Sequence, residues 1–242
     1  MTELDPRLLA LYDIDNPDGP DHEYFRSLAD DVGARTILDL GCGTGILTVT
    51  LAGDNRRVTG IDPSDGMLAI ARGRPGADLV SWVLGDSRAI GDMAADFAVM
   101  TGNVAQHILG DDWPRTLRDL CRGLASGATL AFESRNPAAA AWNHWTKEQT
   151  LQTRETDAGA LTEWISVNSV DAHGNVEFES HNIFGRTGEH LKYQSTLAFR
   201  SADDITRELD AAGFSVRNIW GNWRRGPVGP TSAVLVFEAV RR

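Results

Sequence analysis

Residues 37–47 read ILDLGCGTGIL, an apolar run that stops at three glycines set two residues apart. Asp39 stands just before these glycines, which are Gly41, Gly43 and Gly45. Glycine is used where the backbone turns with a positive φ or where another group must approach closely. We therefore interpret the stretch as a buried strand that ends in a loop built for close approach.

Composition limits what the chain can be. Its 242 residues allow one large α/β domain, or one domain with a small insertion. The formal net charge of −11 repels phosphate backbones, so we predict no nucleic-acid partner. Two cysteines are too few for a disulfide framework, and no stretch approaches the ~18 apolar residues of a membrane span. We predict a cytoplasmic protein without a membrane partner.

Short apolar runs alternate with helical patterns over the first 140 or so residues. Each run is too short for a helix and ends at Gly, Asp or Glu, which indicates buried strands of a parallel sheet. The predicted strands are 36–40, 58–61, 79–84, 96–101 and 128–133, and the predicted helices are 45–52, 63–72 and 112–125. This alternation predicts a Rossmann-like α/β fold with helices on both faces.

The pattern changes after about residue 150. Leu161–Val170, Asn175–Phe184 and Leu191–Phe199 alternate with period two and are separated by turn signals, which predicts a three-stranded antiparallel β-meander. A helix at 202–212 and strands at 214–220 and 233–240 follow. No helix separates the last two strands, so they form an antiparallel pair. We expect a seven-stranded, mostly parallel core from 1–149 and 201–242, with an insertion at 150–200.

Polar residues gather where the parallel strands end, which is where such sheets bind ligands. Asp62 ends the second predicted strand, and its carboxylate can accept hydrogen bonds from both hydroxyls of a ribose. Asp86 and Ser87, one strand further on, can meet the edge of an adenine. Gly102, Asn103 and Glu133 complete the edge. The sequence therefore predicts an adenosine site across the strand ends.

ILDLGCGTGIL resembles the cofactor loop of class I S-adenosylmethionine-dependent methyltransferases, and VTGIDPSDGMLAIAR and LGDSRAI resemble their second and third motifs. The resemblance covers about residues 10–140 and 200–242. It implies S-adenosylmethionine as cofactor, with Asp62 on the ribose, Met67 and Ser87 on the adenine, and Asp86 beside the adenine amino group. The implied cofactor residues are Tyr12, Tyr24, Asp39, Gly41, Gly43, Gly45, Asp62, Pro63, Met67, Asp86, Ser87 and Asn103.

Small bacterial methyltransferases with a three-stranded meander before the last helix are the most similar subgroup, and some methylate amino sugars or other small metabolites. Tyr12-Asp13 resembles the pair that closes over their cofactor, with Tyr24 in support; alternatively, both tyrosines simply pack an N-terminal helix. The segment 101–103 reads TGN and lacks the prolines of nucleic-acid aminomethylases, so methylation of bases is not expected.

The acceptor site is predicted from one histidine and several tryptophans. His107 follows Asn103 by four residues and is the candidate general base, because a neutral imidazole takes a proton near pH 7. Alternatively, His107 bonds the loop backbone or shapes the pocket. Tryptophans in and around the meander suit an apolar, sugar or cationic acceptor, or they fix the meander to the core. The predicted acceptor residues are Gln106, His107, Trp142, Trp145, Trp164 and Trp223.

We therefore expect a methyltransferase acting on O or N of a small molecule, as a monomer or homodimer, with the meander as a lid. A protein or peptide methyltransferase and a catalytically silent cofactor-binding module are the alternatives. A nicotinamide oxidoreductase is disfavoured because Ile46 occupies the position of the third glycine in the dinucleotide-binding pattern G-x-G-x-x-G. The six histidines lack metal-ligand spacing, so no metal is expected.

Overall fold

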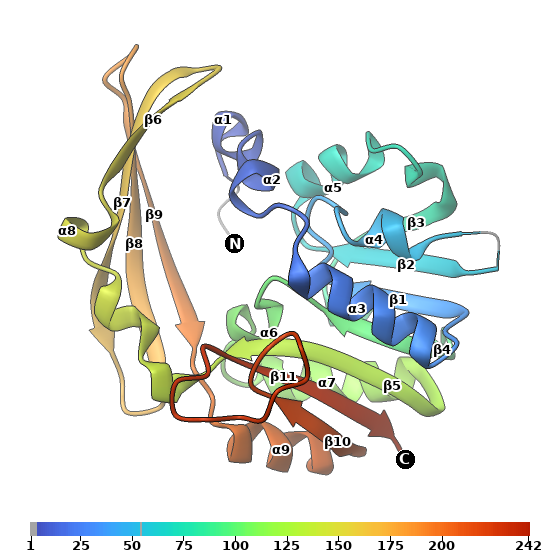
Figure 1. Ribbon diagram of the computed structural model, residues 1–242. Coiled ribbons are helices and arrows are strands. Elements are labelled where there is room, and N and C mark those ends of the chain that lie inside the picture. Colours follow the sequence, from blue (N-terminus) through green and yellow to red (C-terminus); the bar gives the residue numbers. More distant parts are fainter. Residues whose placement is uncertain (1–3, 54) are drawn as a thin grey trace.

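The computed structural model describes residues 4–53 and 55–242, and these form two β-sheets flanked by helices (Figure 1). The larger sheet has seven strands in the order β10-β11-β5-β4-β1-β2-β3. Its strands are β1 (Thr36–Leu40), β2 (Arg57–Asp62), β3 (Val80–Leu84), β4 (Ala95–Met100), β5 (Leu124–Arg135), β10 (Phe214–Trp220) and β11 (Val234–Arg241). β11 runs antiparallel to both neighbours, whereas β1 to β5 pair in parallel. The predicted core fold, with its antiparallel last strand, is confirmed.

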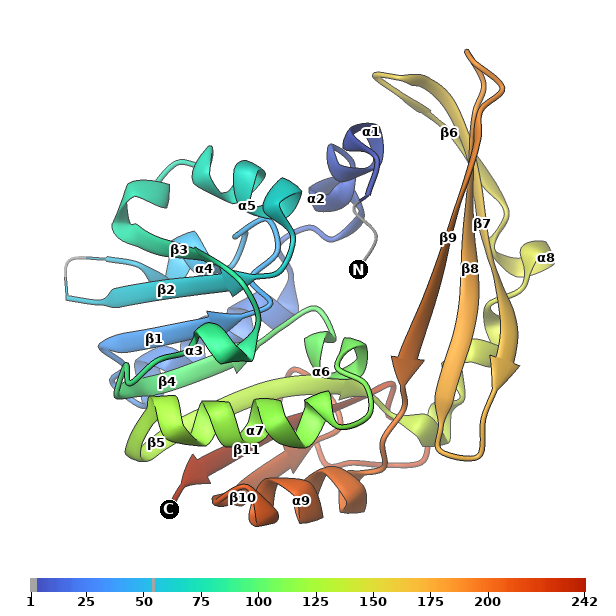
Figure 2. The ribbon, with the colours of Figure 1, turned by 180° about the vertical axis from the view of Figure 1, so that it is seen from behind.

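Helices cover both faces of this sheet because its strands are apolar on both sides. On one face, α3 (Pro20–Asp31) and α4 (Thr48–Leu51) bury Phe25 and Leu51 completely. On the other, α7 (Asp112–Gly123) and α9 (Ala202–Ala211) bury Leu117 and Leu209. Figure 2 shows α7 and α9 on the face opposite α3. Complete burial of each such side chain contributes about 1.5–3 kcal/mol.

The second sheet has four antiparallel strands, where three were expected. It comprises β6 (Gln152–Thr156), β7 (Gly159–Val170), β8 (Asn175–Phe184) and β9 (His190–Ala198). The expected meander is β7 to β9, and β6 is the addition. Its sequence, QTRET, has no apolar residue and lies at the edge of the sheet, so its hydrophobic pattern gave no strand signal.

Two element bounds differ from the expectations. The helix expected over 45–52 is only α4, because the residues after the glycines form turns. β5 begins at Leu124 rather than 128, since α7 ends at Gly123. A Cβ on Gly123 would lie 2.2 Å from Cγ2 of Ile90, so glycine permits close packing where the helix passes into the strand.

Short N-terminal helices lie between the two sheets (Figure 1). They are α1 (Pro6–Leu9), which contacts α5 (Asp65–Arg72), and α2 (Tyr12–Asp15). Leu11 packs against Leu161 and Phe184 of the second sheet, and Arg154 of β6 forms an ion pair with Asp15. The second sheet therefore rests on the segment that precedes α3.

Two further short helices complete the described chain, α6 (Val104–His107) and α8 (Lys147–Thr150). Within residues 4–53 and 55–242, no helix combines the length and apolar character needed to cross a membrane. The division into a core and an insertion, the cytoplasmic location and the monomeric or homodimeric state stay predictions.

Candidate active site

The three glycines of the opening stretch have different reasons to be glycine, although all three have positive φ (78°, 53° and 73°). A Cβ on Gly41 would lie 2.4 Å from Val104, and one on Gly45 would lie 2.5 Å from the ring of Trp82. Protein side chains therefore approach these two. A Cβ on Gly43 would meet only Tyr12, at 3.9 Å, so Gly43 is the glycine left open to a ligand.

Asp62 ends β2 directly beside this loop and is 7% exposed. Its Oδ2 accepts a hydrogen bond from the amide of Gly43 at 2.8 Å, and its Oδ1 accepts one from the amide of Ser64 at 2.9 Å. Burial raises the pKa of Asp62, while these two amides oppose the rise. Each carboxylate oxygen keeps a free lone pair, so the fixed carboxylate can still accept from ligand hydroxyls.

Asp39 lies in β1, immediately before the loop, and is fully buried. Its Oδ2 accepts from the hydroxyl of Thr48 at 2.7 Å, but its Oδ1 has no partner among the described residues. Burial raises the pKa of Asp39 to about 7, and the charge of Asp62 adds to the rise. A buried carboxylate oxygen without a donor is costly, so this position suits a ligand that brings one.

A small network fixes the N-terminal segment over the loop. The hydroxyl of Thr44 donates to Asp13 Oδ1 at 2.6 Å, and the guanidinium of Arg74 donates to the other oxygen of Asp13. Arg74 Nε also donates to the carbonyl of Thr44 at 2.5 Å. This network holds α2 so that the neighbouring Tyr12 faces Gly43, and closure of Tyr12 over a cofactor stays a prediction.

An open hollow of about 480 Å³ continues the site past the end of β3. Its lining comprises Pro63, Leu84, Gly85, Asp86, Arg88 and Ala89. Leu84 is an apolar side chain that is 54% exposed, and an aromatic base stacked there would cover it. Met67 lies one turn away, in the first turn of α5, where its amide donates to the N-cap Ser64.

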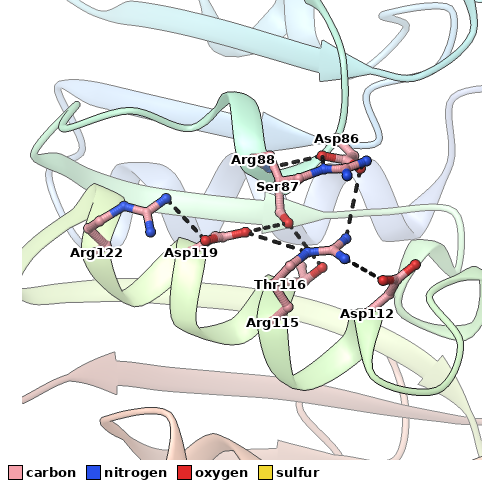
Figure 3. Close-up of polar contacts among 8 residues, drawn as sticks. All are labelled: Asp86, Ser87, Arg88, Asp112, Arg115, Thr116, Asp119 and Arg122. Carbon is pink, nitrogen blue, oxygen red and sulfur yellow. Dashed lines mark hydrogen bonds and ion pairs between the residues drawn. The ribbon is translucent and has the colours of Figure 1, made fainter.

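Ser87 does not point into this hollow. Its hydroxyl donates to Asp119 Oδ2 at 2.8 Å and accepts from the hydroxyl of Thr116, both on α7 (Figure 3). The buried side chain therefore anchors the turn, and only its backbone can meet an adenine edge. The Asp86 carboxylate is bound by Arg88 and lies 3.8 Å from Arg115, which lowers the pKa of Asp86.

A second buried carboxylate, Glu133, lies where β5 passes the end of β4. Asn103 has a left-handed backbone (φ 61°), and its amide donates to Glu133 Oε1 at 2.5 Å. Glu133 Oε2 and Asn103 Oδ1 are both buried and have no partner among the described residues. Burial raises the pKa of Glu133 to about 7. The sequence placed Glu133 on the predicted ligand-binding edge but gave it no role there.

α6 carries His107 and is held by residues distant in sequence. The side chain of Gln106 accepts from Arg135 Nη1 at 3.1 Å, and Arg200 donates to the carbonyls of Ala105 and Ile108 at 2.9 and 2.6 Å. His107 is exposed to solvent yet closely surrounded, and this crowding, with the charge of Arg135, lowers its pKa. It is therefore neutral at pH 7, as a general base requires.

Three predicted site residues lie elsewhere. The hydroxyl of Tyr24 donates to Glu238 at 2.5 Å in the core, and Trp223 packs with its ring centroid 5.8 Å from that of Tyr24. Trp164 stacks on His181 at 4.4 Å, on the face of the second sheet that contacts Lys147 of α8 and not the core. Tyr24 and Trp223 therefore have the packing role of the alternative, whereas Trp164 packs on the outer face of the second sheet and does not fix the meander to the core.

The remaining two tryptophans lie nearer the site. Trp142 and Trp145 pack against Phe199, with centroid distances of 4.6 and 5.9 Å. The guanidinium of Arg135 lies 5.7 Å from the ring of Trp145, which brings Trp145 close to the residues around α6. Among the described residues, no three His, Cys, Asp or Glu side chains are grouped to hold a metal ion.

These residues fit S-adenosylmethionine. Asp62 presents acceptors for ribose hydroxyls, Pro63 and Leu84 offer an apolar surface for adenine, and the unpartnered Asp39 Oδ1 offers an acceptor to an ammonium group. The bare Gly43 leaves room for the chain between them. Tyr12 is the side chain that lies nearest to this open position at Gly43.

Residues 37–127 match a family model described as a methyltransferase domain. An uncharacterised methyltransferase of Schizosaccharomyces pombe is 27% identical over 189 residues, which are 76% of this chain and 60% of that protein. The matches span only 20% to 60% of the length of the first curated relatives. The chain thus shares a domain with proteins that extend beyond the matched part.

Solved structures match nearly the whole chain. The CcbJ methyltransferase from Streptomyces caelestis has a TM-score of 0.78 at 19% identity, covering 98% of this chain and 96% of that one. The sugar N-methyltransferase KedS8 from Streptoalloteichus sp. ATCC 53650 has a TM-score of 0.75 at 19% identity, covering 100% and 95%. At such identities the likeness establishes the fold, including the second sheet.

Proposed function

Because this chain contains a methyltransferase domain at residues 37–127 and has the class I fold of S-adenosylmethionine-dependent methyltransferases, we propose that it methylates O or N of a small-molecule acceptor. The enzyme class and the cofactor follow from that domain. When bound, S-adenosylmethionine supplies a methyl group on a positively charged sulfur, which a nucleophile displaces in line.

One observation carries the cofactor part of the proposal. The carboxylate of Asp62 is fixed by the amides of Gly43 and Ser64, next to the one glycine of the loop that no side chain crowds. Asp62 binds the ribose, Gly43 lets the cofactor pass, and Tyr12 excludes water from above. Asp39 accepts from the ammonium group at the far end.

A small polar acceptor suits the space beyond Tyr12. A cavity of about 160 Å³ lies between α1, α2 and the second sheet, and Tyr12 lines it as well as facing Gly43. Polar groups of the second sheet, among them Glu163, Asn182 and Tyr193, line the opposite side. Such hydroxyl, amide and carboxylate groups match a sugar-like molecule. KedS8, which has this fold, is named as a sugar N-methyltransferase.

The second sheet acts as the acceptor lid in this proposal. Its ties to the core run through α2 and α6, which also bear Tyr12 and His107. Exchange of residues 150–200 for the equivalent segment of a relative should change the acceptor range but leave affinity for S-adenosylhomocysteine unchanged. Loss of that affinity would contradict the lid role.

The test of the proposed function is calorimetric titration with S-adenosylmethionine, S-adenosylhomocysteine and NAD, followed by an acceptor screen. We expect both sulfur nucleosides, but not NAD, to bind. Asp62→Ala should weaken them by about 100-fold, because two charge-assisted hydrogen bonds are lost. Unchanged affinity in Asp62→Ala would refute the proposed site.

Two alternatives give different outcomes in the same experiment. Tight binding of S-adenosylhomocysteine with no turnover on any acceptor indicates a silent binding module. Turnover on peptides, but not on amino sugars or other metabolites, indicates a protein or peptide methyltransferase. Neither alternative has a structural observation of its own in its favour.

A further inference from the structure

Two buried carboxylates on neighbouring strands of the large sheet are satisfied very differently. Glu238 of β11 accepts from Tyr24 at 2.5 Å, from Trp220 at 2.8 Å and from Asn218 at 2.6 Å. Burial alone would raise the pKa of Glu238, but these hydrogen bonds lower it. The protein therefore provides three hydrogen-bond donors to Glu238, the carboxylate with a structural role in this sheet.

Glu133 of β5 has no such supply. It is 2% exposed, and the Asn103 amide is its one hydrogen-bond donor among the described residues. The charged groups that face it are Asp21 of α3, which adds negative charge, and Arg135 of β5, which forms no ion pair with it in the described structure and is bonded to Gln106. The protein thus leaves this carboxylate open on one oxygen.

A second open acceptor belongs to the residue whose amide is bonded to Glu133. Asn103 Oδ1 is also buried without a partner, and Asn103 is tied to Glu133 through its own amide. Buried acceptors in native proteins are normally paired with donors. A hydroxyl carries one hydrogen and can satisfy one of them, whereas an ammonium group carries three hydrogens. Two open acceptors on residues that are bonded to each other therefore favour an amine over an alcohol.

We propose that Glu133 and Asn103 bind the amino group of the acceptor, so that the chain methylates nitrogen. This inference rests on the proposed function. The Glu133 carboxylate takes one proton from the bound ammonium and becomes a carboxylic acid. The freed nitrogen lone pair then forms the new bond to the methyl carbon, while the carbon–sulfur bond breaks with its electron pair left on sulfur. The product nitrogen carries the positive charge that sulfur has lost.

The position of Glu133 separates this role from cofactor binding. β4 lies between β5 and β1, which leads into the glycine loop, so Glu133 is two strands removed from Asp39. Asp39 already offers an open buried acceptor beside that loop. Glu133 also lies two residues after Ala131, which packs on the α3 face, so its side chain points to that face, where Asp21 of α3 adds its charge.

The probe is methylammonium chloride, with methanol as the matched alcohol, added to the full chain saturated with S-adenosylhomocysteine. Infrared difference spectra follow the protonated carboxyl band at pH 6.5, roughly half a unit below the point where Glu133 is half ionised. We expect methylammonium, but not methanol, to convert the acid to carboxylate in the wild type. Glu133→Gln should lose this signal and bind methylammonium about 10- to 100-fold more weakly.

Glu238→Gln is the matched buried control, and it should leave the methylammonium response intact. A wild-type protein that binds S-adenosylhomocysteine but does not respond to methylammonium overturns this inference alone. If Glu133→Gln weakens S-adenosylhomocysteine itself, the pair binds the cofactor's amine and the inference is also overturned. Failure of the wild type to bind S-adenosylhomocysteine overturns the proposed function, and this inference with it.

Discussion

The two halves of the sheet edge differ in how their polar groups are used. At the ends of β1, β2 and β3, most acidic side chains are held by nearby backbone amides or arginines, as Asp62 and Asp86 are. At the ends of β4 and β5, Asn103 and Glu133 keep open acceptor oxygens, and His107 keeps a solvent-exposed ring. In the first half, the protein itself supplies most of the hydrogen-bond donors and fixes the side chains for the cofactor. In the second half, open acceptor oxygens remain for donors that the methyl acceptor would bring.

This difference teaches where specificity resides. In the cofactor half, the acids at the ends of β2 and β3 are fixed by residues one or two positions away or by the adjoining loop, as Asp62 is by Ser64 and Gly43, and Asp86 by Arg88. The acceptor half is assembled from β4, β5, α6 and the link between β9 and α9, through Gln106, Arg135 and Arg200. Changes in the second half should therefore alter turnover and acceptor choice and leave cofactor affinity unchanged.

His107→Ala provides the sharpest separation of the two halves. A neutral imidazole on α6 can take up the proton that the methylated nitrogen releases, so its loss should lower turnover by roughly 100-fold or more, while S-adenosylhomocysteine, which we assign to the other half, should bind within about twofold of wild type. Rates of S-adenosylhomocysteine formation and calorimetry measure the two effects. An unchanged rate with the true acceptor would leave His107 only a role in shaping the pocket.

A pair of glycine variants tests the cofactor half internally. Gly45→Val drives methyl groups into Trp82 from a backbone with positive φ, and it should cost about 3 kcal/mol of unfolding free energy. Gly43→Ala meets only Tyr12, so its effect on stability should be smaller and its effect on cofactor affinity larger. Urea denaturation and calorimetry distinguish them, and equal stability losses would contradict the assignment of separate roles.

The raised pKa of the Glu133 carboxyl group should also affect how the stability of the folded chain depends on pH. The pKa of Glu133 rises to about 7 in the folded chain from an ordinary 4.5, so between these values the folded state binds more protons than the unfolded state. Stability then falls as pH rises through this window. Glu133→Gln should remove that part of the fall, by a few degrees in Tm at roughly 2–4 °C per kcal/mol.

Differential scanning fluorimetry of both proteins without ligand, from pH 4.5 to 7.5, measures this effect; the window is set by the same ordinary and raised pKa values. The difference between wild type and variant cancels groups that both share, including Asp39, whose pKa is raised in the same direction. Parallel curves for the two proteins would show that Glu133 is ionised in the folded chain across the whole window.

The smallest effect is expected outside both halves. Trp164 stacks on His181 and lies under Lys147, on the face of the second sheet turned away from the core. Trp164→Ala should therefore leave turnover within about twofold of wild type, as surface changes usually do. Trp145→Ala, beside Arg135, should lower it further. A larger loss from Trp164→Ala would place the acceptor on the opposite face.

Much of the fold could be predicted from the sequence because its signals are local. The runs that became β1 to β4 are apolar and end at glycine or acid, and the missing helix between β10 and β11 fixed their antiparallel pairing. β6 was missed because QTRET is a polar edge strand with one neighbour, so no hydrophobic period marks it. Its pairing with β7 decides its structure.

The sequence by itself determined the cofactor half, since a glycine loop and an acid at the next strand end place their own groups through short connections. Only the tertiary structure decided which glycine is open, that Tyr24, Trp164 and Trp223 pack away from the site, and that Glu133 meets Asn103. Those facts depend on contacts between residues from different elements, such as Asn103 with Glu133 and Tyr24 with Glu238. Burial and the supply of hydrogen-bond donors arise only when such segments pack together, so no local pattern encodes them.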